Sequence, residues 1–355
     1  MLSGSVGQLA AKEKPSGHYV QTNLVSDVPG LALATDPHLV NPWGLSVSAA
    51  GPWWVSDNGT GLSTLYNGAG AIQALVVTVP NVAAVTDASA PTGTVFNGTA
   101  TDFLVAPGKP SRFLFCTEGG TIVGWNSGAA GVQMVNNSGR AVYKGLALAK
   151  ISGANYLYAA NFQAGTIDVF DRAFAPVTLA PSAFRDPHLP HHFAPFNVQA
   201  IGDWIYVTYA RKEPGSIDEI HGPAQGFVDV YSTDGILHHR LQHGAWFNAP
   251  WGVALAPADF GSASNMILVG QFGSGKIAMF DPATGKFRGL LRGEHRRPIV
   301  IEGLWAIAFG NGASAGPLNT LYFAAGIDDE AHGLFGTLTA VADPVGHDDD
   351  DHDED

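Results

Sequence analysis

The densest histidine cluster of the sequence lies between residues 186 and 192. This segment reads Asp-Pro-His-Leu-Pro-His-His and carries imidazoles at His188, His191 and His192. Neutral imidazoles at such spacing can share a Zn²⁺ or Cu²⁺ ion. The two prolines break the segment, so it also fits a solvated loop. A metal site and an exposed loop are therefore both open for it.

Two other segments combine carboxylates with a histidine. Glu213–His221 and Asp328–His332 each contain three acidic residues and one histidine. Hard cations such as Ca²⁺ prefer oxygen ligands. Either segment could hold a cation, and both could act together if they meet on one face. The alternative is that both are solvated acidic loops.

The sequence offers no complete catalytic constellation. We expect no Gly-x-Ser-x-Gly nucleophile elbow, no zinc-protease motif, no phosphate-binding loop and no dinucleotide fingerprint on a strand-turn-helix unit. The single cysteine, Cys116, excludes an internal disulfide and zinc-cysteine sites. Its neighbours in Phe113–Thr117 predict a buried strand and a core thiol rather than a nucleophile. No catalytic residue is assigned.

The charge and the apolar runs of the chain argue against nucleic-acid binding and against a membrane span. The net charge is −13, and seven acids fall within the last eight residues, Asp348 to Asp355. There is no basic stripe, so we expect no nucleic-acid binding. No apolar run is long enough for a membrane helix, so we expect no membrane span.

The elements that position these groups come from a repeat. One unit recurs six times at intervals of about fifty residues. Each unit begins with an anchor motif, a small turn followed by an apolar run. An apolar strand and a period-two strand that starts at a glycine follow. The anchors are Asn41–Leu45, Lys144–Leu148, Ala249–Val253 and Glu302–Trp305, with weaker copies at Thr94–Asn97 and Pro195–Val198.

Three strands plus an outer fourth strand make one propeller blade, so the repeat predicts an all-β, six-bladed β-propeller with four-stranded antiparallel blades. The outer strands are expected at Ile72–Val79, Gln133–Val135, Val177–Leu179, Leu237–Leu241 and Phe287–Leu291. The sixth unit lacks one, and we expect the N-terminal strand His18–Val25 to close the ring.

The predicted boundaries define one domain, residues 18–342, between a flexible N-terminus (1–17) and a disordered acidic tail (343–355). The blades are expected at about 41–80, 91–137, 141–180, 192–244, 248–293 and 298–341. Two long polar loops, 181–192 and 211–225, stand out as places where function could lie.

Residues beside each anchor should converge on the axis of the ring. They could bind a small polar ligand or a protein partner, and they are Asn41, Trp43, Asn97, Lys144, Asn197, Trp251, Glu302 and Trp305. A divalent cation, Ca²⁺ or Zn²⁺, would take ligands from Glu302, Asn197, His188, His191 and His192. A second ring could come from Asp57, Glu118, Asn161 and Gln271. The alternative is structural: indoles wedged between blades and polar groups that cap turns.

Several motifs resemble those of a bacterial propeller family of unassigned function, whose members are usually predicted to be exported. They are Asn23–Asp27, Asn41–Leu45, Ser56–Thr60, Gly226–Val230, Ala249–Ala254 and Asp329–Gly336. The resemblance spans residues 18–341 and implies the propeller fold and an extracellular or periplasmic location. Residues 1–17 lack the apolar run of a signal peptide, which leaves the cytoplasm as the alternative.

More distantly, the repeats are similar to NHL-type repeats and to gluconolactonase-like propellers. Glu302–Trp305 resembles the Glu-Gly-Pro-x-Trp segment of the lactonases, with Leu304 in place of the proline. In the lactonases this segment supplies a metal-binding glutamate. The resemblance therefore implies Glu302 as a metal ligand.

Three functions follow as expectations. The first is an exported ligand- or partner-binding propeller with a cation in its axial channel. The second is a metal-dependent hydrolase of the lactonase kind. The third is a structural protein that assembles through its faces or edges.

Overall fold

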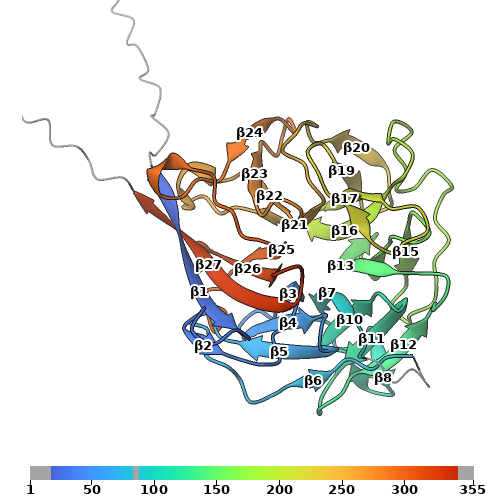
Figure 1. The fold of residues 1–355 in the computed structure, drawn as a ribbon. Helices are drawn as coiled ribbons and strands as arrows, with labels where there is room; N and C mark the ends of the chain where they lie inside the picture. Colours follow the sequence, from blue (N-terminus) through green and yellow to red (C-terminus); the bar gives the residue numbers. More distant parts are fainter. Residues whose placement is uncertain (1–16, 83–87, 343–355) are drawn as a thin grey trace, which may run out of the picture.

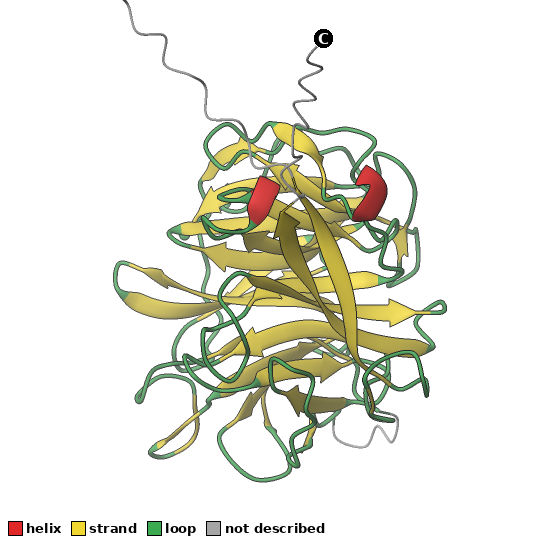
Figure 2. Cartoon of the chain, turned by 90° about the vertical axis from the view of Figure 1, so that its left-hand side faces the viewer, coloured by secondary structure: helices red, strands yellow, loops and turns green. Residues whose placement is uncertain are grey.

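The computed structural model describes residues 17–82 and 88–342. The expectations for residues 1–16 and for the acidic tail lie outside them. Within the described residues the chain forms six antiparallel sheets arranged around a central axis (Figure 1). The predicted six-bladed β-propeller is confirmed. Figure 2 shows how fully strands dominate, with two short helical turns, Gly261–Ala263 and Glu294–Arg296, in the described part.

The blades follow one another along the chain, each from the axis outward. Blade 1 holds β3 (Pro42–Val47), β4 (Trp53–Asp57), β5 (Leu62–Tyr66) and β6 (Val77–Thr78), and blade 2 holds β7 (Pro91–Phe96), β10 (Phe113–Thr117), β11 (Thr121–Trp125) and β12 (Val132–Asn136). Blade 3 holds β13 (Tyr143–Ile151), β14 (Ala154–Asn161) and β15 (Thr166–Phe170). Blade 4 holds β16 (Phe193–Ile201), β17 (Trp204–Lys212), β19 (Phe227–Ser232) and β20 (Leu237–Arg240), with β18 (Glu219–Ile220) beside β17.

Blade 5 holds β21 (Pro250–Leu255), β22 (Ile267–Gln271), β23 (Ile277–Phe280) and β24 (Phe287–Leu290). Blade 6 holds β25 (Leu304–Phe309), β26 (Thr320–Ile327), β27 (His332–Ala342) and β1 (Gly17–Ser26), with β2 (Ala34–Thr35) parallel to β1. A hairpin of β8 (Leu104–Ala106) and β9 (Lys109–Pro110) is inserted in blade 2.

The N-terminal strand closes the ring, as predicted. β1 pairs antiparallel with β27, so the first described strand completes the last blade. Tyr19 of β1 is buried, donates a 2.8 Å hydrogen bond from its hydroxyl to Phe260 O and accepts one from Ala263 N at 2.9 Å. These contacts join the closing strand to the neighbouring blade 5.

Two outer strands differ from expectation. Blade 3 has three strands, because the expected outer strand Val177–Leu179 contributes one bond, from Val177 N to Val169 O, next to an isolated bridge between Pro176 and Phe170. Proline has no N–H to donate to a ladder, which limits pairing on this edge. In blade 1 the outer strand shrinks to Val77–Thr78.

Apolar clusters between neighbouring blades hold the ring together, and the period-two alternation decides which blade each side chain meets. Trp53 packs against Tyr322 of blade 6 with ring centroids 4.8 Å apart. The next residue, Trp54, points the other way and stacks on Phe113 of blade 2 at 4.1 Å. Both indoles are buried.

A bulge near the start of every inner strand sets the register around the axis. In blade 1 the pairing of β3 with β4 slips between Pro42 and Leu45, and the other five blades slip at the corresponding place. Aligning the bulges gives two rings. The first ring is Trp43, Thr92, Lys144, Phe196, Trp251 and Trp305, and the second ring is Gly44, Gly93, Gly145, Asn197, Gly252 and Ala306.

Two anchors therefore differ from the sequence alignment. In blade 2 the anchor is Pro91–Gly93, and Asn97 follows the opposite end of β7. In blade 6 the equivalent of Gly44 is Ala306 rather than Gly303.

Candidate functional site

The inner strands all begin on one side of the ring, which we call the anchor face. Aromatic side chains close the axis there and pack as one buried cluster: Trp43, Phe162, Phe196, Trp251, Phe272 and Trp305. Trp43 and Trp305 stack with centroids 3.5 Å apart, and Phe272 stacks on Trp305 at 3.9 Å. The first ring has an ammonium at the position that holds an indole in three other blades.

Lys144 supplies that ammonium, and its side chain is 2% exposed. Its Nζ lies 3.1 Å from Glu118 Oε1 and 3.4 Å from Glu219 Oε2. The faces of Trp43 and Phe162 lie 5.2 and 5.3 Å from Nζ, within cation–π range. Burial lowers the pKa of Lys144, but Glu118 and Glu219 outweigh it and raise that pKa. The lysine is therefore charged.

Glu219 reaches the axis from the long insertion between β17 and β19. Its carboxyl lies between Lys144 and His221, whose Nε2 is 3.4 Å from Glu219 Oε1. Burial raises the pKa of Glu219, and the contacts with His221 and Lys144 lower it below its ordinary value. The pKa of His221 is raised, chiefly by its hydrogen bond with Glu219.

Glu330 comes from the loop between β26 and β27. Asn41 Nδ2 donates to Glu330 Oε2 at 2.6 Å, while Asn41 Oδ1 accepts from Trp305 Nε1 at 3.0 Å. Burial raises the pKa of Glu330 to about 7, and nearby Glu219 and Glu118 add to the rise. Positive φ angles of 56°, 50° and 67° at Asp328, Asp329 and Glu330 show that this loop is strained, a feature common at functional sites.

A second amide links two of the carboxylates. Asn58 Nδ2 donates to Glu118 Oε2 at 3.1 Å, and Asn58 Oδ1 accepts from Asn41 Nδ2 at 3.3 Å. Asn41 and Asn58 thus hold Glu330 and Glu118 in place. We call Glu118, Lys144, Glu219 and Glu330 the axial cluster.

A hollow of about 470 Å³ adjoins the axial cluster on the anchor face. His221, Phe272, Glu302, Asp329 and Glu330 are among its lining residues. Glu302 Oε1 accepts a 3.1 Å hydrogen bond from Asp328 N. Carboxylates outnumber basic groups here, so the site favours positive charge. Glu330 can also exchange a proton near neutral pH.

The structure brings most predicted axial residues together. Trp43, Lys144, Trp251 and Trp305 share the first ring, and Asn41 binds Trp305. Trp251 Nε1 donates to Lys144 O at 3.0 Å. Glu302 lines the anchor-face hollow beside them.

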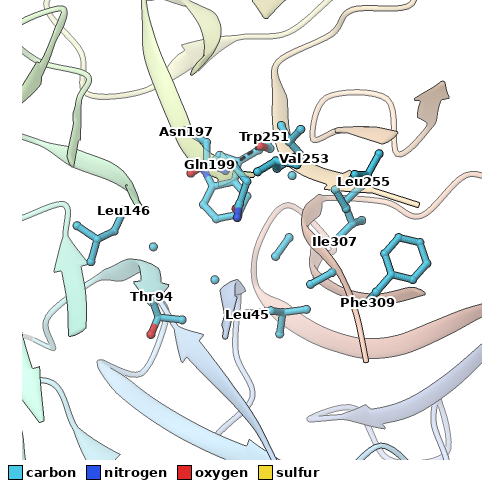
Figure 3. Close-up of a pocket in the computed structure, with 17 residues that line it drawn as sticks. Leu45, Thr94, Leu146, Asn197, Gln199, Trp251, Val253, Leu255, Ile307 and Phe309 are labelled. Atoms are coloured by element: carbon cyan, nitrogen blue, oxygen red, sulfur yellow. Dashed lines mark hydrogen bonds between the residues drawn. The ribbon is translucent and has the colours of Figure 1, made fainter. Parts of the chain in front are cut away.

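The other two amides lie elsewhere. Asn97 donates to Ser111 O at 2.8 Å and to Asp102 O at 3.0 Å, in a loop on the face opposite the anchors. Asn197 belongs to the second ring and donates to Trp251 O at 2.8 Å. It lines a separate axial hollow, drawn in Figure 3.

The five predicted metal ligands fall in three places. Glu302 lines the anchor-face hollow and Asn197 the axial hollow of Figure 3, while His191 and His192 line a hollow between blades 3 and 4. His188, His191 and His192 are all exposed. Across residues 17–82 and 88–342, no three His, Cys, Asp or Glu side chains are grouped as a metal site.

The sequence did not predict that Glu118, Glu219, Glu330 and His221 form one site. The two acidic segments do meet, because His221 and Glu330 line one hollow. Glu118 was grouped with Asp57, Asn161 and Gln271, yet the pairing aligns it with Asn58 instead. Asp57 is fully buried, and burial raises its pKa well above the ordinary value.

The positions of Cys116 and Ser314 in the fold argue against both residues as nucleophiles. Cys116 is buried, and burial raises the pKa of its thiol to about 12. Gly312–Gly316 reads Gly-Ala-Ser-Ala-Gly, the pattern of a hydrolase nucleophile elbow. It lies in the loop between β25 and β26, with Ser314 exposed and no helix after it. It is therefore a turn rather than an elbow.

No helix in the described ranges is both long and apolar enough to span a bilayer. No family model matches the chain. Among solved structures, a streptogramin B lyase is 12% identical with a TM-score of 0.51, over 92% of this chain and 98% of the lyase. The virginiamycin B lyase of Staphylococcus aureus is 15% identical with a TM-score of 0.51, over 92% and 100%. At these identities the likeness shows the fold alone.

Closer relatives come from Acanthamoeba polyphaga mimivirus. The uncharacterized protein R648 is 30% identical over 327 residues, which are 89% of this chain and 78% of the relative. The uncharacterized protein L690 is 32% identical over 327 residues, 89% and 84% of the two chains. The chain belongs to the protein family that includes R648 and L690.

Proposed function

We propose that this protein is a ligand-binding propeller that takes a small cationic ligand beside its axial cluster. The observation that carries the proposal is that Glu118 and Glu219 lie on the buried ammonium of Lys144, while Glu330 from a third blade interacts electrostatically with all three. Their charge exceeds what Lys144 balances. The excess leaves a negative potential at the mouth of the axis.

The adjoining hollow describes the ligand. Glu302, Asp329 and Glu330 offer carboxylate oxygens, and Phe272 offers an aromatic surface. Oxygen ligands suit a divalent cation such as Ca²⁺. An aromatic surface beside carboxylates also suits an organic ammonium. Both are cations, and they differ in which side chains they need.

Calorimetric titration of the purified protein with CaCl2, ZnCl2 and propane-1,3-diamine tests the proposal. We expect one of these cations to bind, and Glu330→Gln to weaken it by about tenfold. Affinity should rise as pH increases through about 7, because Glu330 then loses its proton. Exposed Glu294→Gln is the matched control. Absence of binding by all three cations at millimolar concentration would contradict the proposal.

A hydrolase is the second candidate, supported by the pKa of Glu330. A carboxyl group with a pKa of about 7 beside His221 suits general acid–base catalysis. Turnover of a lactone and ester panel, abolished by Glu330→Gln, is the expected result for this candidate. Loss with Glu302→Gln that is rescued by divalent ions would favour the metal-dependent lactonase mechanism.

Two further expectations stay predictions. Export to the periplasm or cell exterior rests on the resemblance to exported bacterial propellers, and fractionation of the native host tests it. A role in assembly rests on the open faces and edges of the ring. Light scattering with and without Ca²⁺ tests that role, and a monomer in both conditions would contradict it.

A further inference from the structure

A second axial hollow lies on the other side of the first ring from the axial cluster. It has a volume of about 230 Å³ and is lined by residues of all six inner strands (Figure 3). The lining starts at the second ring and runs to Leu255 and Phe309 at the far ends of β21 and β25. We infer that this hollow binds a small neutral molecule that combines an apolar body with a hydrogen-bond donor.

The lining gives the charge and polarity of the ligand. None of the described residues around the hollow has an ionisable side chain. Branched apolar side chains, those of Leu45, Leu146, Val253 and Ile307, share the lining with the uncharged polar side chains of Thr94, Asn197 and Gln199. A charged molecule would lose its hydration there without meeting a counter-charge, which is costly. The ligand is therefore neutral.

Asn197 gives the position of the donor. Five members of the second ring are glycine or alanine, and Asn197 is the sixth. Its Nδ2 donates to Trp251 O at 2.8 Å, which fixes the orientation of the amide. Gly145 leaves room for it, since a Cβ there would lie 2.1 Å from Asn197 Oδ1.

The oxygen of this amide is open to a ligand. Nothing in the described part of the chain donates a hydrogen bond to Asn197 Oδ1. The residue is 3% exposed, but Oδ1 is not among the fully enclosed atoms that lack a partner, so it keeps accessible surface. Buried carbonyl oxygens are normally paired. A ligand that donates an O–H or N–H to this atom would complete the pairing.

The volume of the hollow limits the size of the ligand. An apolar cavity of about 150 Å³ is enough to hold benzene, so a hollow of about 230 Å³ accepts one aromatic ring with a hydroxyl substituent. Leu255 is 46% exposed at the rim and extends the apolar surface toward solvent. The ligand class is thus a phenol or an aromatic alcohol.

The site is separate from the one proposed above. The two hollows share no lining residue. Trp251 lines the axial hollow and bonds through its indole to Lys144 O on the anchor-face side.

The test uses phenol, toluene and benzoate as probes of the full-length protein. We expect phenol to bind, toluene to bind about tenfold more weakly because it has no donor, and benzoate not to bind. Methyl resonances of Leu45, Leu146, Val253 and Ile307 should shift with phenol. Benzoate binding, equal affinity for toluene, or shifts confined to other methyl groups would overturn the inference.

Ala308→Phe tests the location. Ala308 lines the hollow and is only partly buried, so a ring there fills the space from the rim. We expect phenol binding to fall at least tenfold, with no change in Leu318→Phe, whose site is 62% exposed and outside the hollow. Undiminished binding in Ala308→Phe would overturn the inference. If that variant fails to fold, the methyl shifts of the wild-type protein still show whether phenol binds in the hollow.

Discussion

Asn41 donates a 2.6 Å hydrogen bond to Glu330, a residue 289 positions away in sequence. The same amide accepts a bond from the indole of Trp305. Asn41 itself has a positive φ of 46°. The closure of the ring therefore places a glutamate of blade 6 against the first anchor, where burial raises its pKa to about 7.

The first prediction concerns pH and Glu330. Its pKa is about 7 in the folded state against 4.5 ordinarily, so between these values the folded protein binds more protons than the unfolded chain. The free energy of unfolding should therefore fall as pH rises through this window, by at most about 3 kcal/mol. Urea denaturation across the window measures it.

The Glu330→Gln variant isolates this contribution. Its stability relative to the wild type should rise with pH, since glutamine has no proton to lose. Exposed Glu294→Gln should follow the wild-type profile. Parallel profiles for the wild type and Glu330→Gln would show that Glu330 titrates normally in the folded state.

The second prediction concerns Lys144. Lys144→Met removes the ammonium and leaves Glu118 and Glu219 facing each other in a buried site. Breaking a buried ion pair from one side costs about 3–5 kcal/mol. We expect a loss of this size in urea denaturation, against little change for exposed Lys150→Met. In the Lys144→Met background, Glu118→Gln and Glu219→Gln together should restore much of it. A loss below about 1 kcal/mol would show that the cluster is effectively solvated.

The arrangement of the ring was predictable because its cause is local and repeated. Alternating apolar residues after each anchor define the strands, and six copies define the blades. Trp43, Trp251 and Trp305 follow the same motif, and they do meet at the axis. The closing strand was predictable from the sixth unit's missing outer strand together with the strand pattern at His18–Val25.

The chemistry was harder to predict, because it depends on loops rather than on the repeat. Glu219 reaches Lys144 only through the insertion after β17, and Glu330 only through a strained turn. Neither path leaves a periodic signal. The misplacement of Asn97 has another cause: Pro91–Gly93 matches the Pro-x-Gly of Pro42–Gly44, but the apolar run of Thr94–Asn97 suggested a later anchor.

The third prediction concerns the closure of the ring. Tyr19→Phe removes the hydroxyl that donates to Phe260 O and accepts from Ala263 N. Leaving buried polar groups unpaired costs about 1–3 kcal/mol. We expect this loss in thermal and urea unfolding, and almost none for exposed Thr22→Ala on the same strand. Equal stability of the two variants would mean that the hydroxyl does not secure β1.

The fourth prediction concerns the second ring. A Cβ at Gly44 would lie 2.4 Å from Thr92 O of the next inner strand. Gly44→Ala should therefore force neighbouring inner strands apart and cost about 1–3 kcal/mol, the usual range for overpacking. At Gly119 the nearest atoms lie at 3.5 Å, so Gly119→Ala is the matched control. Urea unfolding compares the stability of the two variants. An unchanged free energy of unfolding in Gly44→Ala would show that the inner strands can move apart without cost.

The fifth prediction uses Cys116, the single thiol of the chain, as a reporter. It is fully buried between blades 2 and 3, and burial raises its pKa to about 12. The thiolate is the reactive form, so the native protein should not react with a disulfide reagent at neutral pH. In urea the reaction should appear together with the loss of circular dichroism.

The same thiol shows whether the ring opens as one unit. If Tyr19→Phe detaches only β1, the change lies far from blade 2. Cys116 should then stay unreactive at urea concentrations below the unfolding transition. If the blades separate cooperatively, reaction at Cys116 should accelerate by the same factor as global unfolding. Acceleration without global destabilisation would contradict both descriptions and point to a local opening between blades 2 and 3.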